Sequence, residues 1–123
     1  MCYNARVDAF FHPGAEKELA RLPDGEKLAM HHAVEKLEAL GPRLPYPHQS
    51  GVKGAEGLRE LRPRAGRSPW RALYRQVGGV MVVAAIGPEA KVNQRGFAAA
   101  VKRARARLAE LEEPRRRQKG ARG

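Results

Sequence analysis

One stretch of the chain decides its fold: WRALYRQVGGVMVVAAI, residues 70–86. Two runs rich in β-branched and aromatic residues lie on either side of Gly78-Gly79, and both glycines can adopt the positive φ angles of a two-residue hairpin turn. We therefore expect antiparallel strands at Trp70–Val77 and Val80–Ile86. Because the second run lacks polar alternation, it is typical of a central strand covered on both faces.

A third strand is expected at Gly57–Arg64, shortly before this hairpin. Successive side chains of a strand point to opposite faces of a sheet. If Leu61 points into the core, three charged side chains share the opposite, open face: Glu60, Arg62 and Arg71. The same alternation places three others on the core face: Trp70, Ala72 and Tyr74. It sends Arg59 inward or to a sheet edge.

The remaining segments predict a strand and three helices around this sheet. The expected elements are a strand at Tyr3–Phe11, a helix from Pro13, a helix at Glu26–Leu40 and a final helix at Asn93–Glu112. We expect an α+β fold in which the N-terminal strand and an antiparallel helix hairpin pack on a small antiparallel sheet. Pro114 is expected to end the last helix, which leaves a single domain over residues 1–112 and a basic, disordered tail over 113–123.

Positive charge is concentrated in the second half of the chain. The 123 residues carry a formal net charge of +11. Residues 1–50 hold six basic and seven acidic residues, whereas residues 51–123 hold 18 basic and six acidic ones. Arginine dominates the second half and lies inside predicted strands, which favours a surface that binds a polyanion such as RNA or DNA.

Other features of the sequence exclude several classes of site. The single cysteine, Cys2, rules out an internal disulfide and suits the cytoplasm, and no apolar run reaches the length of a membrane-spanning helix. The sequence has no Cys/His spacing for zinc, no phosphate-binding loop, no dinucleotide-binding glycine pattern and no Gly-x-Ser-x-Gly motif. We therefore expect neither a metal nor an organic cofactor.

Arginines on adjacent strands of a rigid sheet suit phosphate chemistry. Each guanidinium can hold two phosphate oxygens and offset the extra charge of a pentacoordinate transition state. RNA supplies its own nucleophile, the 2′-hydroxyl, so its cleavage needs no metal. Arginine does not transfer protons at neutral pH because its pKa is too high. The candidates for proton transfer are Glu60, Lys91, His48 and Tyr74.

Most of these residues have a structural alternative. Glu60 can instead pair with the neighbouring arginines and orient them. Tyr74 and Trp70 are more typical of core packing than of proton transfer or base stacking, and His48 is more typical of a solvated loop. The simplest interpretation of the basic helix residues at 102–107 is a solvated face, and a contact with phosphate is the second interpretation. The residues expected to bind RNA phosphates are Lys53, Arg59, Arg67, Arg75 and Arg95.

Two motifs and the order of elements resemble a known family. The chain reads Leu58-Arg59-Glu60-Leu61-Arg62, then Arg71-Ala72-Leu73-Tyr74, then an apolar strand leading to Lys91. This pattern is similar to the RelE/ParE superfamily of type II toxins, and most to its phage-derived, HigB-like branch. Members of that branch tend to show a Leu-x-Glu-Leu-Arg strand followed by an Arg-x-x-Tyr strand. The resemblance covers roughly residues 3–112 and implies a RelE-like fold.

The resemblance also implies an activity and partners: a metal-independent, ribosome-dependent mRNA endonuclease that is neutralised by a cognate helix-turn-helix antitoxin. By position, Arg62 and Arg71 match the basic sheet residues that would bind the scissile phosphate. The residues assigned to catalysis are Glu60, Arg62, Arg71 and Lys91. The segment Gly87–Lys91 departs from the family's frequent Phe-x-Lys-Lys, and Arg59 stands where an aromatic residue is common.

The leading hypothesis is therefore a cytoplasmic toxin that cleaves mRNA on the ribosome and inhibits translation. The first alternative is a ParE-like DNA gyrase poison, which needs no acid or base and so suits the missing lysine pair. The second alternative is an inactive toxin whose remaining role is to bind its antitoxin. Sequence patterns leave these alternatives open.

Overall fold

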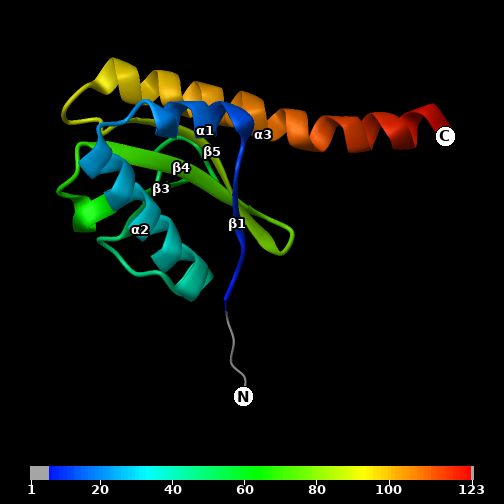
Figure 1. Cartoon of the computed structure of the whole chain (residues 1–123). Helices are drawn as coiled ribbons and strands as arrows, with labels where there is room; N and C mark the ends of the chain where they lie inside the picture. The colour runs from blue at the N-terminus through cyan, green and yellow to red at the C-terminus, as the bar shows by residue number, and fades with distance from the viewer. Residues whose placement is uncertain (1–5, 123) are drawn as a thin grey trace.

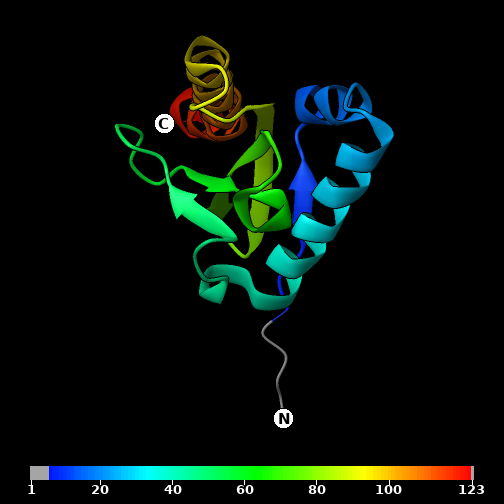
Figure 2. The same cartoon turned by 90° about the vertical axis from the view of Figure 1, so that its left-hand side faces the viewer.

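A mixed five-stranded sheet with helices on both faces forms the body of the protein (Figures 1 and 2). The computed structural model describes residues 6–122. The α+β class predicted from the sequence is confirmed. The elements are β1 (Ala9–Phe11), α1 (Pro13–Ala20), α2 (Asp24–Leu40), β2 (Gln49–Gly51), β3 (Arg59–Leu61), β4 (Trp70–Val77), β5 (Val80–Pro88) and α3 (Gln94–Arg122), with short 3₁₀ turns at Gly41–Arg43 and Pro63–Gly66.

The β4–β5 hairpin is the centre of the sheet, as the sequence predicts. The strand order is β1-β5-β4-β3-β2, and the hairpin register runs from Trp70 opposite Pro88 to Val77 opposite Val80. Of the two turn glycines, Gly78 has a positive φ of 60°. A shift of register between Leu73 and Tyr74 marks a β-bulge, which increases the local twist.

Two apolar cores lie on opposite faces of this sheet. The core under α1 and α2 contains the residues expected on the core face, with Ala72 and Tyr74 buried and Trp70 packed at its border. The core under α3 contains Leu73 and Ala85 together with the apolar seam of the helix: Ala100, Ala104 and Leu108. Residues 81–87 of β5 are all buried, so this strand is covered on both faces as predicted.

Several boundaries differ from the prediction. β1 pairs parallel to β5, with Ala9 opposite Met81, because two helices separate β1 from the hairpin and a connection of that length permits parallel pairing. The strand expected over Tyr3–Phe11 is shorter, and its first residues lie outside the described part. β2 is an unpredicted edge strand in the proline-rich loop. α1 and α2 form the expected pair of helices joined by a short turn, from which they diverge (Figure 1).

The last helix also differs from the prediction, because α3 continues past Pro114 to Arg122. Beyond the sheet, the distal part of α3 projects away from the body of the domain (Figure 1). A proline removes one backbone donor and clashes with the preceding turn, but it does not always end a helix. Within residues 6–122, no helix is both long and apolar enough to span a membrane.

The partly buried carboxylate of Glu18 joins α1 to both β5 and α3. It accepts hydrogen bonds from the Ile86 backbone N–H at 2.9 Å, from Arg103 at 3.0 Å and from Arg107 at 3.0 and 3.1 Å. The two guanidinium groups also donate to the carbonyls of Ile86 and Ala84. Arg103 and Arg107 therefore hold the helix to the sheet, contrary to the solvated or phosphate-binding face expected for them, whereas Lys102 and Arg105 are exposed as that face predicts.

The charge state of Glu18 follows from these contacts. Burial alone would raise its pKa, but the hydrogen bonds from Arg107 and Ile86 and the charges of Arg103 and Arg107 outweigh burial. They lower the pKa of Glu18 below its ordinary value of 4.5. A carboxylate with a depressed folded-state pKa stabilises the protein above its unfolded-state pKa, and this stabilisation is lost as pH falls through the folded-state value.

We therefore expect Glu18→Gln to lower the free energy of unfolding by about 1–3 kcal/mol at pH 7, the range for hydrogen bonds to charged groups. The difference from wild type should shrink as the pH is lowered below 4.5. Urea unfolding followed by circular dichroism at several pH values measures it. Glu16→Gln, on an exposed residue of the same helix, is the control; an equal loss in both variants would contradict the role of Glu18.

Close contact between β5 and α3 gives a second prediction. A Cβ at Gly87 would lie 2.6 Å from the Ala100 Cβ, whereas a Cβ at Gly79 would meet nothing within 4 Å. Gly87→Ala should therefore destabilise the protein by about 1–3 kcal/mol through overpacking. Gly79→Ala should change stability by less than about 0.5 kcal/mol. Adding Ala100→Gly to Gly87→Ala should restore part of the loss, and no restoration would show that the clash lies elsewhere.

Candidate functional site

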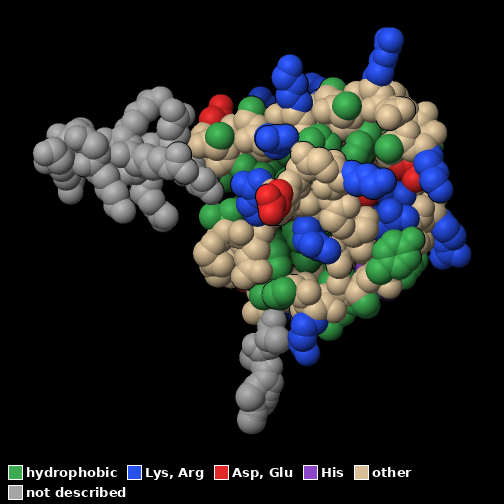
Figure 3. Space-filling view, turned by 180° about the vertical axis from the view of Figure 1, so that it is seen from behind, with side chains coloured by type: hydrophobic (Ala, Val, Ile, Leu, Met, Phe, Trp, Pro, Cys, Tyr) green, Lys and Arg blue, Asp and Glu red, His purple; other side chains and the backbone are tan. Residues whose placement is uncertain are grey.

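Among the charged side chains on the face of the molecule away from α1 and α2, lysine and arginine predominate over aspartate and glutamate (Figure 3). A polar hollow of about 170 Å³ opens between β3, β4 and the segment that follows β5. Its lining brings together all four residues that the sequence assigns to catalysis, together with two others: Glu60, Arg62, Arg71, Glu89, Ala90 and Lys91. Strand alternation thus placed Glu60, Arg62 and Arg71 correctly on one face.

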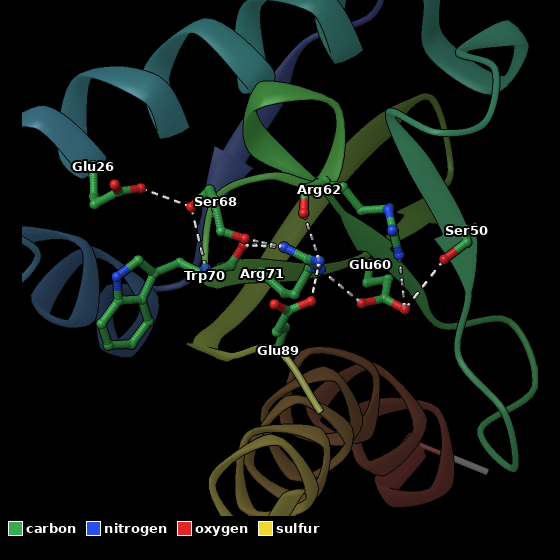
Figure 4. A network of polar contacts seen from close by, with 9 residues as sticks. Glu26, Ser50, Glu60, Arg62, Ser68, Trp70, Arg71 and Glu89 are labelled. Carbon is green, nitrogen blue, oxygen red and sulfur yellow. Dashed lines mark hydrogen bonds and ion pairs between the residues drawn. The ribbon is translucent and has the colours of Figure 1, made fainter. Parts of the chain in front are cut away.

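Arg71 lies at the back of this hollow and is 1% exposed (Figure 4). One terminal nitrogen donates to the carbonyls of Ser68 at 2.7 Å and Trp70 at 2.9 Å. The other donates to Glu89 Oε2 at 2.6 Å and to the Gly66 carbonyl at 3.3 Å. Its Nε lies 3.2 Å from Glu60 Oε1, an ion pair without hydrogen-bond alignment. The guanidinium is therefore already enclosed by protein acceptors.

This geometry corrects the role expected for Arg71. The sequence predicts that its guanidinium binds the scissile phosphate, but its terminal nitrogens are used by protein groups and its side chain is buried. Burial lowers the pKa of Arg71 below its ordinary value, and the charge of Arg62 lowers it further, while the charges of Glu89 and Glu60 act to raise it. Arginine remains protonated at neutral pH. Arg71 is thus a buried cation that positions two carboxylates.

Arg62 is held much more loosely than Arg71. Its Nη1 lies 3.9 Å from Glu60 Oε2, and its Cζ lies 5.5 Å from the centre of the Tyr46 ring. Its Nε is buried and has no hydrogen-bond partner among the described residues. A buried donor without a partner is uncommon and calls for an explanation. The terminal nitrogens of Arg62 donate no hydrogen bond among the described residues, so Arg62 is the arginine of the hollow with donors available to a ligand.

Glu60 is fixed from two sides at the mouth of the hollow. The Ser50 hydroxyl donates to its Oε2 at 3.1 Å, and its Oε1 faces Arg71. These contacts agree with the orienting role considered for Glu60 from the sequence. A carboxylate has about four lone-pair directions, so it retains the capacity to accept a further proton or hydrogen bond from a ligand.

Glu89 is a member of the site that the sequence reasoning missed. A signal for it exists: an arginine inside a buried strand needs a counter-ion, and Arg71 pairs with Gly87 on the neighbouring strand. Glu89 lies two residues beyond Gly87 and is one of only six acidic residues in the second half of the chain. Its backbone N–H also donates to the Pro69 carbonyl at 2.8 Å, which fixes the start of the segment that carries Lys91.

The turn between β3 and β4 is held by a third carboxylate, Glu26 of α2. Glu26 accepts from the buried Ser68 hydroxyl at 2.7 Å and from Arg64 at 2.6 Å, and these hydrogen bonds lower its pKa. Arg64 and Ala65 have φ angles of 55° and 56°, in the left-handed region that is unfavourable for residues with a Cβ. The Glu26 contacts thus stabilise a strained turn whose Gly66 carbonyl faces Arg71.

Two of the candidates for proton transfer, Tyr74 and His48, do not line the polar hollow, whereas Lys91 does. Tyr74 is buried in the core under α1 and α2, where burial raises its pKa although Arg59 acts to lower it. His48 lies before β2, where its backbone carbonyl accepts from the Arg62 N–H at 2.8 Å and its backbone N–H donates to the Pro45 carbonyl at 2.9 Å. Lys91 is exposed on the rim. No group of three or more potential ligand side chains could hold a metal ion within the described part of the chain.

The predicted RNA-binding residues divide into two groups. Lys53 lines a second, more apolar hollow of about 390 Å³ that borders the first. Arg67 and Arg95 are exposed, and Arg75 lies beside Gly57 on the outer part of β4. Arg59 is the exception, because strand alternation puts it on the opposite face, where it lines a different hollow with Tyr74 and donates to Gln49 at 2.6 Å.

The contrast between the two arginines gives a stability prediction. Arg71→Ala should lower the free energy of unfolding by about 3 kcal/mol, since it removes one partner of a buried ion pair and leaves carboxylates facing each other. Arg62→Ala should cost less than about 1 kcal/mol, because Arg62 has a long ion pair and a cation–π contact. Urea unfolding measures both, and similar losses would contradict the division of roles.

Comparisons with known proteins agree with this architecture. Residues 17–109 match the model of a family described as "Phage derived protein Gp49-like (DUF891)". A mutant of the E. coli toxin RelE in the free state is 19% identical, with a TM-score of 0.58 over 80% of this chain and 97% of that chain. The RelBE2 toxin–antitoxin complex from Mycobacterium tuberculosis contains a chain that is 19% identical, with a TM-score of 0.54 over 69% of this chain and 100% of that chain.

No curated protein matches the sequence significantly. The family model spans most of the chain, including β3, β4, β5 and all residues of the polar hollow. The solved structures share the same α+β arrangement over almost their whole length. The chain therefore belongs to the phage-derived Gp49-like family and has the fold of the RelE toxins.

Proposed function

We propose that this protein is the toxin of a type II toxin–antitoxin system, acting in the cytoplasm as a ribosome-dependent mRNA endonuclease that inhibits translation. The observation that carries the proposal is the polar hollow, where the available guanidinium of Arg62 lies beside the carboxylate of Glu60 and the ammonium group of Lys91. The RelE fold supports it, because the hollow lies on the sheet of that fold.

In the proposed reaction, Arg62 binds a non-bridging oxygen of the scissile phosphate and stabilises the charge that develops on it. The 2′-hydroxyl of the preceding ribose attacks phosphorus, and Glu60 accepts its proton. The bond from phosphorus to the 5′-oxygen breaks, and Lys91 donates a proton to the leaving oxygen. The products are a 2′,3′-cyclic phosphate and a 5′-hydroxyl. Arg71 and Glu89 keep Glu60 and the Lys91 segment in place.

The surrounding cations support RNA as the substrate. Phosphate contacts from lysine and arginine provide most sequence-independent affinity for nucleic acids. Lys53, Arg67, Arg75 and Arg95 would hold phosphates on either side of the hollow, whereas Arg59, on the other face of the sheet, would not. Of the lining residues, three are cationic and two are anionic, so the hollow retains a positive charge at neutral pH.

A cognate antitoxin with a helix-turn-helix domain is the proposed protein partner. The similar chain from M. tuberculosis is described as part of a toxin–antitoxin complex, which supports a partner of this kind. An acidic segment of the antitoxin would cover the basic hollow and so block RNA. This arrangement would neutralise the toxin without any covalent change.

One observation favours a non-enzymatic alternative. Both carboxylates of the hollow are already engaged by arginines, and the lysine pair expected from the family resemblance is replaced by Glu89-Ala90-Lys91. A DNA gyrase poison or an inactive toxin that binds only its antitoxin would need no general base. Growth arrest with double-strand DNA breaks and intact mRNA would identify the gyrase poison, and an absence of arrest would identify the inactive form.

The proposal predicts that Arg62→Ala abolishes mRNA cleavage while the protein remains folded. Removing one transition-state donor should lower cleavage by at least about 100-fold. The measurement is a transcriptome-wide map of new RNA 5′ ends after brief induction. Cuts should lie within translated reading frames and should carry 5′-hydroxyl groups.

The matched control is Lys36→Ala, which removes a cation from α2 on the other side of the sheet. It should leave the map unchanged. Unchanged cleavage in Arg62→Ala, at equal protein level, would contradict the assignment of the phosphate to this residue. Loss of cleavage in both variants would show that net charge rather than the hollow is responsible.

A further inference from the structure

Tyr46 is an aromatic residue placed unusually for a small domain, because its side chain is 71% exposed. Pro45 and Pro47 flank it and restrict the backbone on both sides. The Arg62 guanidinium lies 5.5 Å from the ring centre, and an exposure of 71% leaves the rest of the ring open to solvent. A flat apolar surface is thus held next to the arginine that has available donors.

A second apolar surface lies on the other side of the polar hollow. The neighbouring hollow of about 390 Å³ is formed by the segment after β2 and the first turns of α3. Its floor is apolar, with half-buried Phe97 and Val101, and its rim carries the side chains of Lys53 and Gln94. This volume and composition suit one flat heterocycle with polar atoms at its edge.

The two surfaces are connected through the polar hollow. Arg62 contacts Tyr46 and lines the polar hollow, and Ala90 lines both the polar and the apolar hollow. The order across the surface is therefore the Tyr46 ring, the Arg62 guanidinium, the Glu60 carboxylate with the Lys91 ammonium group, and then the apolar hollow. A phosphate at Arg62 would have a base-sized apolar surface on each side of it.

We propose that this surface binds unpaired bases: one base next to the bound phosphate stacks on Tyr46, and the base on the other side of the phosphate enters the apolar hollow beside Phe97. The proposal rests on RNA binding at the polar hollow and extends it by naming the subsites and the form of the substrate. Bases in a duplex are stacked on each other and cannot separate in this way, so the substrate must be single-stranded.

The test uses binding rather than cleavage. The probe is a fluorescein-labelled RNA pentamer with 2′-O-methyl groups, which removes the nucleophile, and the readout is fluorescence anisotropy at low salt because phosphate contacts weaken with salt. Wild type should bind the single strand at least tenfold more tightly than a duplex of the same sequence. Tyr46→Ala should weaken binding by roughly 5- to 140-fold, the range for loss of one base–aromatic stack.

Matched variants separate stacking from other effects. Tyr46→Phe keeps the ring and should bind like wild type. Ala98→Leu fills the apolar hollow from an exposed position and should weaken binding, whereas Ala106→Leu, at an exposed position of the same helix that does not line the hollow, should not. Scanning an abasic nucleotide through the pentamer should reveal one position where Tyr46→Ala has no further effect and another where Ala98→Leu has none.

Equal binding of wild type, Tyr46→Ala and Ala98→Leu would overturn the inference, as would failure of the wild type to bind the pentamer at all. The outcome is independent of the cleavage experiment. Base-dependent binding without mRNA cuts would keep the subsites and remove the nuclease proposal. Loss of mRNA cuts in Arg62→Ala, together with unchanged RNA binding in Tyr46→Ala, would support the nuclease proposal and contradict the base-binding subsites.

Discussion

The burial of one guanidinium, that of Arg71, sets the arrangement of the site. A cation that is 1% exposed requires partners, and it draws them from three separate parts of the chain: Glu60 on β3, Glu89 after β5 and carbonyls of the turn before β4. Because each partner is ordered by this contact, the two walls and the back of the hollow form together. The arginine closest to ligand chemistry, Arg62, is left comparatively free by the same arrangement.

Much of the fold could be predicted from the sequence because its signals are local. Gly78-Gly79 and the apolar run at Val80–Ile86 specify a central hairpin by turn chemistry and periodicity alone. β2 was not predicted, since three residues in a proline-rich loop carry no periodicity and become a strand only by pairing with β3. The parallel direction of β1 likewise depends on a contact between distant segments, because β1 pairs with β5.

Most charged members of the polar hollow could be predicted from the sequence, but Glu89 and the roles of the residues could not. Strand alternation identifies Glu60, Arg62 and Arg71 as neighbours, yet it cannot show how much of a side chain is buried by the turn that folds over it. Burial is what distinguishes Arg71 from Arg62. The same limit applies to Arg103 and Arg107, whose sequence pattern predicts a solvated helix face. Only the structure shows that Glu18, 85 and 89 residues away, accepts their hydrogen bonds.

The contact between Arg71 and Glu89 has a consequence for how sequences of this kind can diverge. The Glu89 carboxylate lies 2.6 Å from the buried guanidinium of Arg71. A lysine at position 89 would replace this counter-ion with a second cation, so that change is tolerable only if position 71 changes too or another acidic residue takes over the contact. The two positions, 18 residues apart, should therefore change together. Among relatives, an acidic residue directly after the last strand should therefore occur together with an arginine in the strand before it.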